Sequence, residues 1–279
     1  MSINDRSSWR AERPWADVHA THDERWAGYL DPDTGLLRTL SSEPIRTAEE
    51  LRRFEDDRVE DRWIELRDEP IHGDFDLQHL QAIHRHLFQD VYPWAGEVRT
   101  VGIQKGGQGF LPPEHVGIVV DGSARMMRED GMLRPGMDNA RWSSLLAERF
   151  NDVNEAHPFR EGNGRTQRLY FDQVAEAGAK TIHWSVLTKE QNIAVSHAAR
   201  GGDLAPLRDA LSVMVTDRMD PLALQRAKQA AEAMRGIRSV PPGQIQGRGA
   251  GAGERSYYGP SGRASGQNMT GPRRDGYER

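Results

Sequence analysis

Apolar residues recur at helical spacing along most of this chain, and residues that cap helix N-termini mark where several of the runs begin. Thr47 and Glu50 form a capping box ahead of one such run, which predicts a helix over 47–67. The next run starts at Asp76 and ends before Tyr92. Further helices are predicted over 113–127, 138–156, 163–177, 188–200, 204–217 and 220–235. The fold class is therefore all-α.

One segment departs from the helical spacing. Residues from Val98 to Gln104 are short of helix formers and rich in β-branched side chains. A flexible stretch, Lys105–Gly109, follows them and leads to Phe110. We expect a small β-hairpin here, and no other segment of the sequence gives a convincing strand signal. The predicted architecture is a helical bundle with one hairpin.

Composition excludes several classes of protein. The 279 residues are 37% hydrophobic, carry a formal net charge of −5 and include no cysteine. No stretch reaches the roughly 18 consecutive apolar residues of a membrane helix, and the start of the chain has no apolar signal-peptide core. Disulfides, thiolate metal sites and cysteine nucleophiles are excluded. The acidic balance argues against a nucleic-acid partner. We expect a cytoplasmic protein with no membrane contact.

Composition also divides the chain into four parts. Residues 1–46 are polar and turn-rich, and we interpret them as an N-terminal extension that ends in a turn at Asp31–Gly35. Residues 47–217 form the main domain, and residues 218–236 form a C-terminal helix. Residues 237–279 are rich in glycine and arginine and almost free of aliphatic side chains, so we expect a disordered tail. On composition, an inert linker is favoured over a nucleic-acid contact for this tail.

The segment with the clearest chemistry lies between two predicted helices and runs from His157 to Arg168, HPFREGNGRTQR. Gly162 and Gly164 permit backbone angles that turn successive N–H groups toward one point, and the following helix adds its positive end. Arg165 and Arg168 lie three residues apart, so their guanidinium groups can hold phosphate oxygens together. These residue types at this spacing predict a phosphate-binding site.

Two further residues complete the site. Glu161 would repel a polyphosphate unless Mg²⁺ lay between them, so it is a candidate magnesium ligand. His157, with an ordinary pKa of about 6.5, is the nearby group able to accept a proton near neutral pH. A base, a metal ligand and a phosphate cradle suit the transfer of either a nucleotide or a phosphoryl group to a hydroxyl.

The same segment matches every fixed position of H-x-F-x-[D/E]-G-N-G-R-x-x-R, and on this motif the chain resembles the Fic family. The stretch Asp90–Arg99 and the residues Phe110–Pro112 are similar to the family's approach to a β-hairpin flap. The resemblance covers residues 47–217 and implies a Fic-type helical bundle with one flap. It also implies transfer of AMP from ATP to a Tyr, Thr or Ser hydroxyl of a target protein.

The resemblance further implies a role for each matching residue. His157 would be the general base, and Glu161 would hold Mg²⁺ between the α and β phosphates. Asn163 and the backbone amides of the loop, including those of Gly162 and Gly164, would bind the α-phosphate. Arg165 and Arg168 would hold the β and γ phosphates, and Phe159 would anchor the loop. The flap would add a strand to an extended target segment, with Lys105 at its tip and Phe110 as a clamp.

Regulation is also part of what the resemblance implies. Many members carry an inhibitory helix with [S/T]-x-x-x-E-[G/N], whose glutamate pairs with the last arginine of the motif. Three segments here have the first spacing, but the residues after the glutamate are Arg13, Pro44 and Arg149, so none completes the pattern. The chain thus resembles Fic toxins silenced by a separate small antitoxin, with Arg168 as the expected contact.

Several points stay open from sequence. One alternative is phosphoryl transfer or a different nucleotide donor on the same scaffold, and another is a non-catalytic module that binds ATP. The target is not identified, although resemblance to Fic toxins suggests topoisomerase subunits. A charged tail of this kind also occurs as an export signal on related effectors, which is a third interpretation of residues 237–279. We interpret His79, His84 and His86 as packing or surface residues, and place Arg160 on a solvated face.

Overall fold

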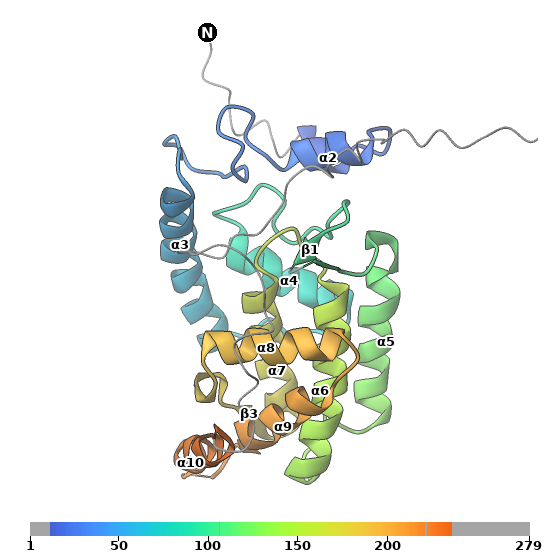
Figure 1. Ribbon diagram of the computed structural model, residues 1–279, viewed down its shortest axis with the longest axis vertical. Coiled ribbons are helices and arrows are strands. Elements are labelled where there is room, and N and C mark those ends of the chain that lie inside the picture. Colours follow the sequence, from blue (N-terminus) through green and yellow to red (C-terminus); the bar gives the residue numbers. More distant parts are fainter. Residues whose placement is uncertain (1–11, 106, 221, 236–279) are drawn as a thin grey trace, which may run out of the picture.

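Long helices form the body of the molecule (Figure 1). The computed structural model describes residues 12–105, 107–220 and 222–235, so the tail predicted over 237–279 lies outside the described part. The principal helices are α3 (Ala48–Asp68), α4 (Leu77–Phe88), α5 (Val116–Glu129), α6 (Asn139–Ala156), α7 (Asn163–Ala177), α8 (Lys189–Arg200), α9 (Ala205–Met214) and α10 (Ala223–Arg235). Each corresponds to a helix predicted from the sequence, and the all-α class is confirmed.

The predicted capping residues begin four of these helices. Thr47 and Thr188 both form complete capping boxes, in which the threonine side chain and the side chain three residues on satisfy each other's backbone N–H groups. Asp76 and Asp138 accept a hydrogen bond from the third N–H of α4 and α6, respectively. Since the first N–H groups of a helix have no partner within the helix, these side chains fix where each helix starts.

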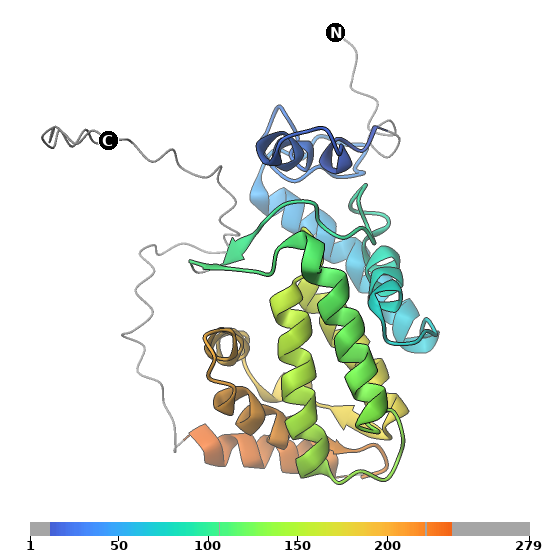
Figure 2. The same cartoon turned by 90° about the vertical axis from the view of Figure 1, so that its right-hand side faces the viewer.

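The helices pack around α7 and share one hydrophobic core. α4 and α6 both contact α7, α3 lies against α4, and α5 and α9 lie against α6. Figure 2 shows α5 and α6 running side by side along the length of the bundle. Aromatic rings make up most of the largest fully buried side chains near the site, beside Arg99 and Arg160: Phe88, Tyr92, Trp94, Phe159, Tyr170 and Phe171. These rings pack beneath the predicted site.

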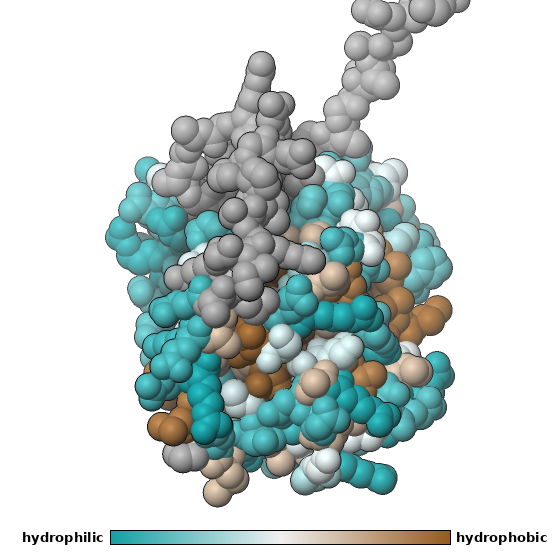
Figure 3. Space-filling model, turned by 60° about the horizontal axis from the view of Figure 1, so that its bottom comes forward, coloured by the Kyte–Doolittle hydropathy of each residue, from teal (hydrophilic) through white to brown (hydrophobic). Residues whose placement is uncertain are grey.

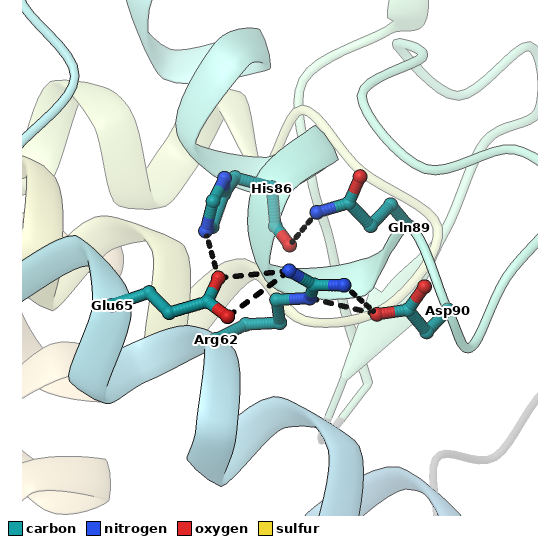
Figure 4. Close-up of polar contacts among 5 residues, drawn as sticks. All are labelled: Arg62, Glu65, His86, Gln89 and Asp90. Atoms are coloured by element: carbon teal, nitrogen blue, oxygen red, sulfur yellow. Dashed lines mark hydrogen bonds and ion pairs between the residues drawn. The ribbon is translucent and has the colours of Figure 1, made fainter.

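A cluster of polar side chains fastens α3 to the end of α4 (Figure 4). Arg62 donates to both oxygens of Glu65 and to Asp90, the latter at 2.7 Å. His86 contacts Glu65 at 2.9 Å, and Gln89 donates to the carbonyl of His86. The cluster is partly exposed, so each pair contributes little alone, but together they fix how α3 lies on α4.

The segment before α3 covers one end of the bundle. It contains the short 3₁₀ helix η1 (Pro14–Ala16) and α2 (His22–Gly28). Its Trp15, Trp26 and Tyr29 are buried in the common core. The predicted turn at Asp31 is present, because that carboxylate accepts from the N–H groups of residues 33 and 34. As Figure 1 shows, this segment lies above α4 and the hairpin.

The predicted hairpin is present but smaller than expected. Strands β1 (Gln104–Lys105) and β2 (Gln108–Gly109) pair in antiparallel fashion. The expectation of a strand over 98–104 was wrong for most of that range. The backbone N–H of Arg99 donates instead to the carbonyl of Pro158, and that of Thr100 to the hydroxyl of Tyr29, so this stretch pairs with no strand among the described residues. A 3₁₀ helix, η2 (Pro113–His115), then leads into α5.

A second small sheet was not predicted. β3 (Lys180–Ile182) pairs with β4 (Val215–Asp217), and the 3₁₀ helix η3 (Trp184–Val186) follows β3. The helix predicted over 204–217 therefore ends at Met214. The Lys180 ammonium group is buried and bonds to Asp217 at 2.7 Å, which holds the two strands together.

The surface around α9 and α10 is mostly hydrophilic (Figure 3). In the part of that face that is not drawn in grey, apolar groups gather at the right edge and near the centre, between hydrophilic side chains. Within residues 12–105, 107–220 and 222–235, no helix combines the length and the apolar content needed to span a bilayer.

Candidate active site

His157 lies where α6 ends, in the left-handed backbone conformation with φ 40° and ψ 63°. Its N–H bonds to the carbonyl of Val153 at 3.0 Å and completes the last turn of the helix. Pro158 follows and cannot continue a helix, since it has no N–H to donate. The sequence thus turns the chain sharply at the histidine and directs the next residues into the motif loop.

The imidazole of His157 is oriented by two neighbours. The ring of Phe110 stacks on it with centroids 3.7 Å apart. Its Nδ1 lies 3.3 Å from the carbonyl of Asn154, which can only accept, so Nδ1 carries the proton and Nε2 keeps a lone pair. Burial lowers the pKa of His157 to about 3, with the cations Lys105 and Arg99 adding to the effect. The ring is therefore neutral near pH 7 and able to accept a proton.

Arg99 is fully buried and holds the loop that carries His157. Its guanidinium group donates to the carbonyl of His157 at 2.8 Å, that of Ala156 at 3.1 Å and that of Val101 at 2.7 Å, and also to that of Leu111. The last two carbonyls flank the hairpin. One arginine thus connects the base of the hairpin to the end of α6.

The two glycines of the motif differ in their backbone roles. Gly162 adopts φ +82° at the N-cap of α7, where a Cβ atom would lie 2.3 Å from the ring of Phe88. Gly164 lies inside the first turn of α7 with open space around it and has no positive φ. The expectation that both glycines use special backbone angles was wrong for Gly164. Gly162 makes the turn, and Gly164 leaves the helix N-terminus uncovered.

Asn163 is buried, and its side chain forms hydrogen bonds within the motif loop. Its Oδ1 accepts from the N–H of Phe159 at 2.9 Å, and its Nδ2 donates to the carbonyl of the same residue at 2.8 Å. Phe159 is itself fully buried. The side-chain amide of Asn163 therefore fixes the shape of the loop. The groups that could bind an anion are the first backbone N–H groups of α7.

The two motif arginines have different surroundings. Arg165 forms an ion pair with Glu55 of α3, and its guanidinium lies 5.0 Å from the centre of the Phe88 ring. Glu55 is 8% exposed and also accepts a hydrogen bond from Tyr92. Arg168 has no ion pair or hydrogen bond with any residue that the structure describes. Sequence analysis missed Glu55, although it falls on the apolar face of α3, where a carboxylate is unusual.

Replacement of Glu55 by alanine should destabilise the fold. The change leaves the Tyr92 hydroxyl and the Arg165 guanidinium without this partner, which should lower the free energy of unfolding by about 1–3 kcal/mol. The matched control is Asp56→Ala, because Asp56 is adjacent, lies 3.6 Å from Arg165 and is 63% exposed. This control should lower the free energy of unfolding by less than about 0.5 kcal/mol. Urea unfolding of both variants checks this, and equal costs would contradict it.

Glu161 is the candidate metal ligand. Its Oε1 accepts from the N–H of Gly162 at 3.1 Å, which keeps the carboxylate beside the start of α7. Among the described residues no group of three or more His, Asp or Glu side chains is placed to hold a metal ion. A lone carboxylate still fits Mg²⁺, since this ion commonly takes one or two protein carboxylates together with substrate phosphates and water.

Of two buried residues near the loop, the sequence interpretation was wrong for Arg160 and confirmed for His84. Arg160, placed on a solvated face, is 1% exposed, and its guanidinium lies 4.5 Å from the Trp26 ring. His84, interpreted as packing, is fully buried and does pack, but it also bonds to the carbonyl of Glu161 at 3.0 Å. Burial lowers the pKa of His84 to about 3, so the ring is neutral. No spacing in the sequence reveals these contacts, because both partners lie far away along the chain.

The hairpin lies over His157 and contacts α8. Lys105 is exposed in β1, next to the turn, while Phe110 follows β2 and is half-buried against the imidazole. Arg200, at the end of α8, covers the other face of Phe110 at 3.9 Å and donates to the carbonyl of Gln108 at 3.0 Å. A cavity of about 350 Å³ beside this contact is lined by Gln108, Gly109, Leu111, Glu155 and Arg200. Figure 2 shows the hairpin standing out from the bundle above α8.

Together, the fold and the site define an all-α domain in which a hairpin lies over a neutral histidine and a short loop leads from that histidine to the N-terminus of α7. Residues 74–175 match the Fic/DOC family. The chain is 34% identical over 143 residues to "probable protein adenylyltransferase Fic" of Escherichia coli K12, and the match covers 50% of this chain and 70% of the relative. It is 33% identical over 188 residues to "probable protein adenylyltransferase y4lH" of Sinorhizobium fredii, covering 66% and 93%. The chain belongs to the Fic/DOC family.

Coverage of other relatives is smaller. The protein adenylyltransferase VbhT of Bartonella schoenbuchensis is 34% identical over 163 residues, which are 58% of this chain but only 34% of VbhT. The chain therefore spans about a third of the length of that relative.

Solved structures agree on the fold. The BepC protein of Bartonella tribocorum, crystallised with bound AMPPNP, superposes with a TM-score of 0.63 at 22% identity, over 68% of this chain and 97% of BepC. The type IV secretion system effector BepA has a TM-score of 0.61 at 27% identity, over 76% of this chain and 75% of BepA. The Fic-type helical bundle is thus confirmed.

Proposed function

We propose that this protein is an adenylyltransferase that moves AMP from ATP to a Tyr, Thr or Ser hydroxyl of a target protein. One observation supports the proposal more than any other. His157 is a neutral histidine whose Nε2 keeps a lone pair, and one short loop joins it to the N-terminus of α7. This arrangement brings a proton acceptor close to an anion site. The names of the relatives support the same activity.

In the proposed reaction, Nε2 of His157 accepts the proton of the target hydroxyl while the hydroxyl oxygen bonds to the α-phosphorus of ATP. The bond from that phosphorus to the β-phosphate oxygen breaks, and pyrophosphate leaves. The backbone amides of Asn163 and Gly164 would stabilise the charge on the α-phosphate, while that of Gly162 stays bonded to the Glu161 carboxylate. Arg168 would hold the outer phosphates with Arg165, whose position Glu55 sets.

Glu161 would hold Mg²⁺ near the phosphates, and the bound ion would supply positive charge to balance that of the pyrophosphate leaving group. The Glu161 carboxylate is kept near the start of α7 by the N–H of Gly162, which suits this role. Lys105 and Phe110 would position the target on the hairpin, with Phe110 next to the histidine that takes the proton.

Regulation by a separate small antitoxin is part of the proposal. The absence of a complete [S/T]-x-x-x-E-[G/N] pattern in the sequence supports it, as does an Arg168 side chain without an ion partner among the described residues. An acidic side chain from such a protein could pair with Arg168 and displace the outer phosphate. Topoisomerase subunits as targets, a cytoplasmic location and export as an effector remain proposals of the same kind.

Labelled ATP tests the reaction directly. The purified chain is incubated with bacterial lysate, Mg²⁺ and ATP labelled at either the α or the γ phosphate. We expect protein labelling from the α position only, because AMP is transferred and pyrophosphate is lost. Labelling from the γ position only would replace this proposal with a kinase. Binding of ATP without labelling from either position would indicate the non-catalytic alternative.

A further inference from the structure

We propose that His84 is a positioning residue for Glu161, and that it sets how well the motif loop binds a magnesium nucleotide. The inference rests on the function proposed above and goes beyond it, because His84 lies on α4, outside the motif. It is 0% exposed and contacts neither solvent nor the predicted phosphate site directly. Its effect would be exerted through the backbone of the loop.

Two hydrogen bonds fix the tautomer of the His84 imidazole. Its Nδ1 lies 2.7 Å from the backbone N–H of Gly96, which can only donate, so Nδ1 must be the unprotonated acceptor. Its Nε2 lies 3.0 Å from the carbonyl of Glu161, which can only accept, so Nε2 carries the proton. The neutral ring therefore bridges the turn before the hairpin to the residue that we assign as the metal ligand.

Aromatic rings hold the imidazole on both sides of this bridge. The ring of Phe159, in the motif loop, stacks on it at 3.8 Å between centroids and 16° between planes. Phe88, one turn further along α4, lies at 4.7 Å and 29°. Phe88 is also the ring that approaches Gly162 most closely. Rotation of His84 would therefore disturb the residues on both sides of Glu161.

Two hydrogen bonds hold the backbone and the side chain of Glu161. Its carbonyl is held by His84, and its carboxylate accepts from the next N–H of the chain. A metal ligand depends on such supporting bonds, whose loss commonly costs about 10–100-fold in metal affinity. We thus expect His84 to act on the contribution of Mg²⁺ to nucleotide binding more than on the stability of the fold.

A second histidine of α4 provides a matched control. His79 is 4% exposed and is bonded at both ring nitrogens, to the N–H of Phe75 at 3.2 Å and to the carbonyl of Ile71 at 2.7 Å. Its partners lie outside the motif loop. His79 Nε2 also lies 3.0 Å from Oε1 of Gln173 on α7. His79→Phe and His84→Phe therefore both remove buried hydrogen bonds at the two ring nitrogens, and only those of His84 reach Glu161.

The experiment measures ATP affinity of the full chain by calorimetry, with Mg²⁺ and with EDTA, alongside the melting temperature of each variant. The ratio of the two dissociation constants gives the gain due to magnesium. We expect His84→Phe to reduce this gain by about tenfold or more, while His79→Phe leaves it unchanged within about threefold. His84→Gln, which can still donate to the Glu161 carbonyl, should recover most of it.

The outcomes separate the inference from the proposed function. If Glu161→Gln keeps the full magnesium gain, Glu161 is not the metal ligand, and that role falls together with the inference. If Glu161→Gln loses the gain but His84→Phe keeps it, the inference alone is overturned. An equal loss in His79→Phe would overturn it as well, because the effect would then be general destabilisation. Should His84→Phe fail to fold, His84→Asn, too short to bridge both partners, has the same expected result.

Discussion

Replacement of His157 by alanine is expected to reduce AMP transfer by at least about a hundredfold, because a positioned general base contributes roughly 10²–10⁴ to such rates. ATP affinity should change by less than about threefold, since the proposed phosphate ligands are the N-terminus of α7 and the motif arginines, not the imidazole. Initial rates of labelling from α-labelled ATP and calorimetric ATP binding give the two quantities. The matched control is His115→Ala, since His115 is exposed at the start of α5 and should leave both unchanged.

The pH dependence of the same rate provides a second check on His157. An ordinary histidine, with a pKa of about 6.5, would lose its free base as the pH falls through that value. Burial lowers the pKa of His157 to about 3, so the neutral form persists well below pH 6.5. The transfer rate should consequently stay level as the pH is lowered from about 8 to about 5.5. A fall in rate centred near pH 6.5, present in the wild type, would contradict the shifted pKa.

Gly162→Ala should be the most damaging single change to the fold among the motif residues. The left-handed backbone at this position costs an alanine about 1–3 kcal/mol. Its methyl group would meet the Phe88 ring at 2.3 Å, and relief of such overlap costs about 1–3 kcal/mol more. The free energy of unfolding should therefore fall by about 2–6 kcal/mol, measured by urea denaturation.

Gly164→Ala is the control for that change, two residues along the same loop. Its position is helical and has no atom within 4 Å of the added methyl group. Alanine there should be neutral or should stabilise the fold by up to about 1 kcal/mol, because glycine loses more backbone freedom on folding. Similar losses at both positions would show that Phe88 and the backbone angle do not distinguish the two glycines.

Sequence periodicity predicted the helices well because local signals determine their ends. Thr47 and Thr188 each carry the complete capping box, and Pro158 ends a helix wherever it falls in such a pattern. The sheet of β3 and β4 was missed because its strands are three residues long and far apart along the chain. Lys180 pairs with Asp217, 37 positions later, so the two strands meet across the whole of α8 and α9. A pairing of that kind leaves no periodic signal.

The same distinction between local and long-range signals applies to the candidate site. The motif predicted which residues would gather at one loop, since they are adjacent along the chain. It did not predict that Glu55 would pair with Arg165, that Arg99 would collect four carbonyls, or that His84 would hold Glu161. The Glu55–Arg165, Arg99–His157 and His84–Glu161 contacts each join residues more than 50 positions apart. They depend on how the helices pack, which the spacing of apolar residues does not specify.

The contact between Arg160 and Trp26 sets a lower limit on the length of a fragment that can fold and function. The guanidinium belongs to the motif loop, whereas the indole comes from α2, some distance before the family-matched residues 74–175. Glu55, which holds Arg165, also precedes them. A fragment cut at residue 74 would keep every letter of the motif and lose two of the side chains that brace it. Transplanting the motif into another scaffold would meet the same obstacle.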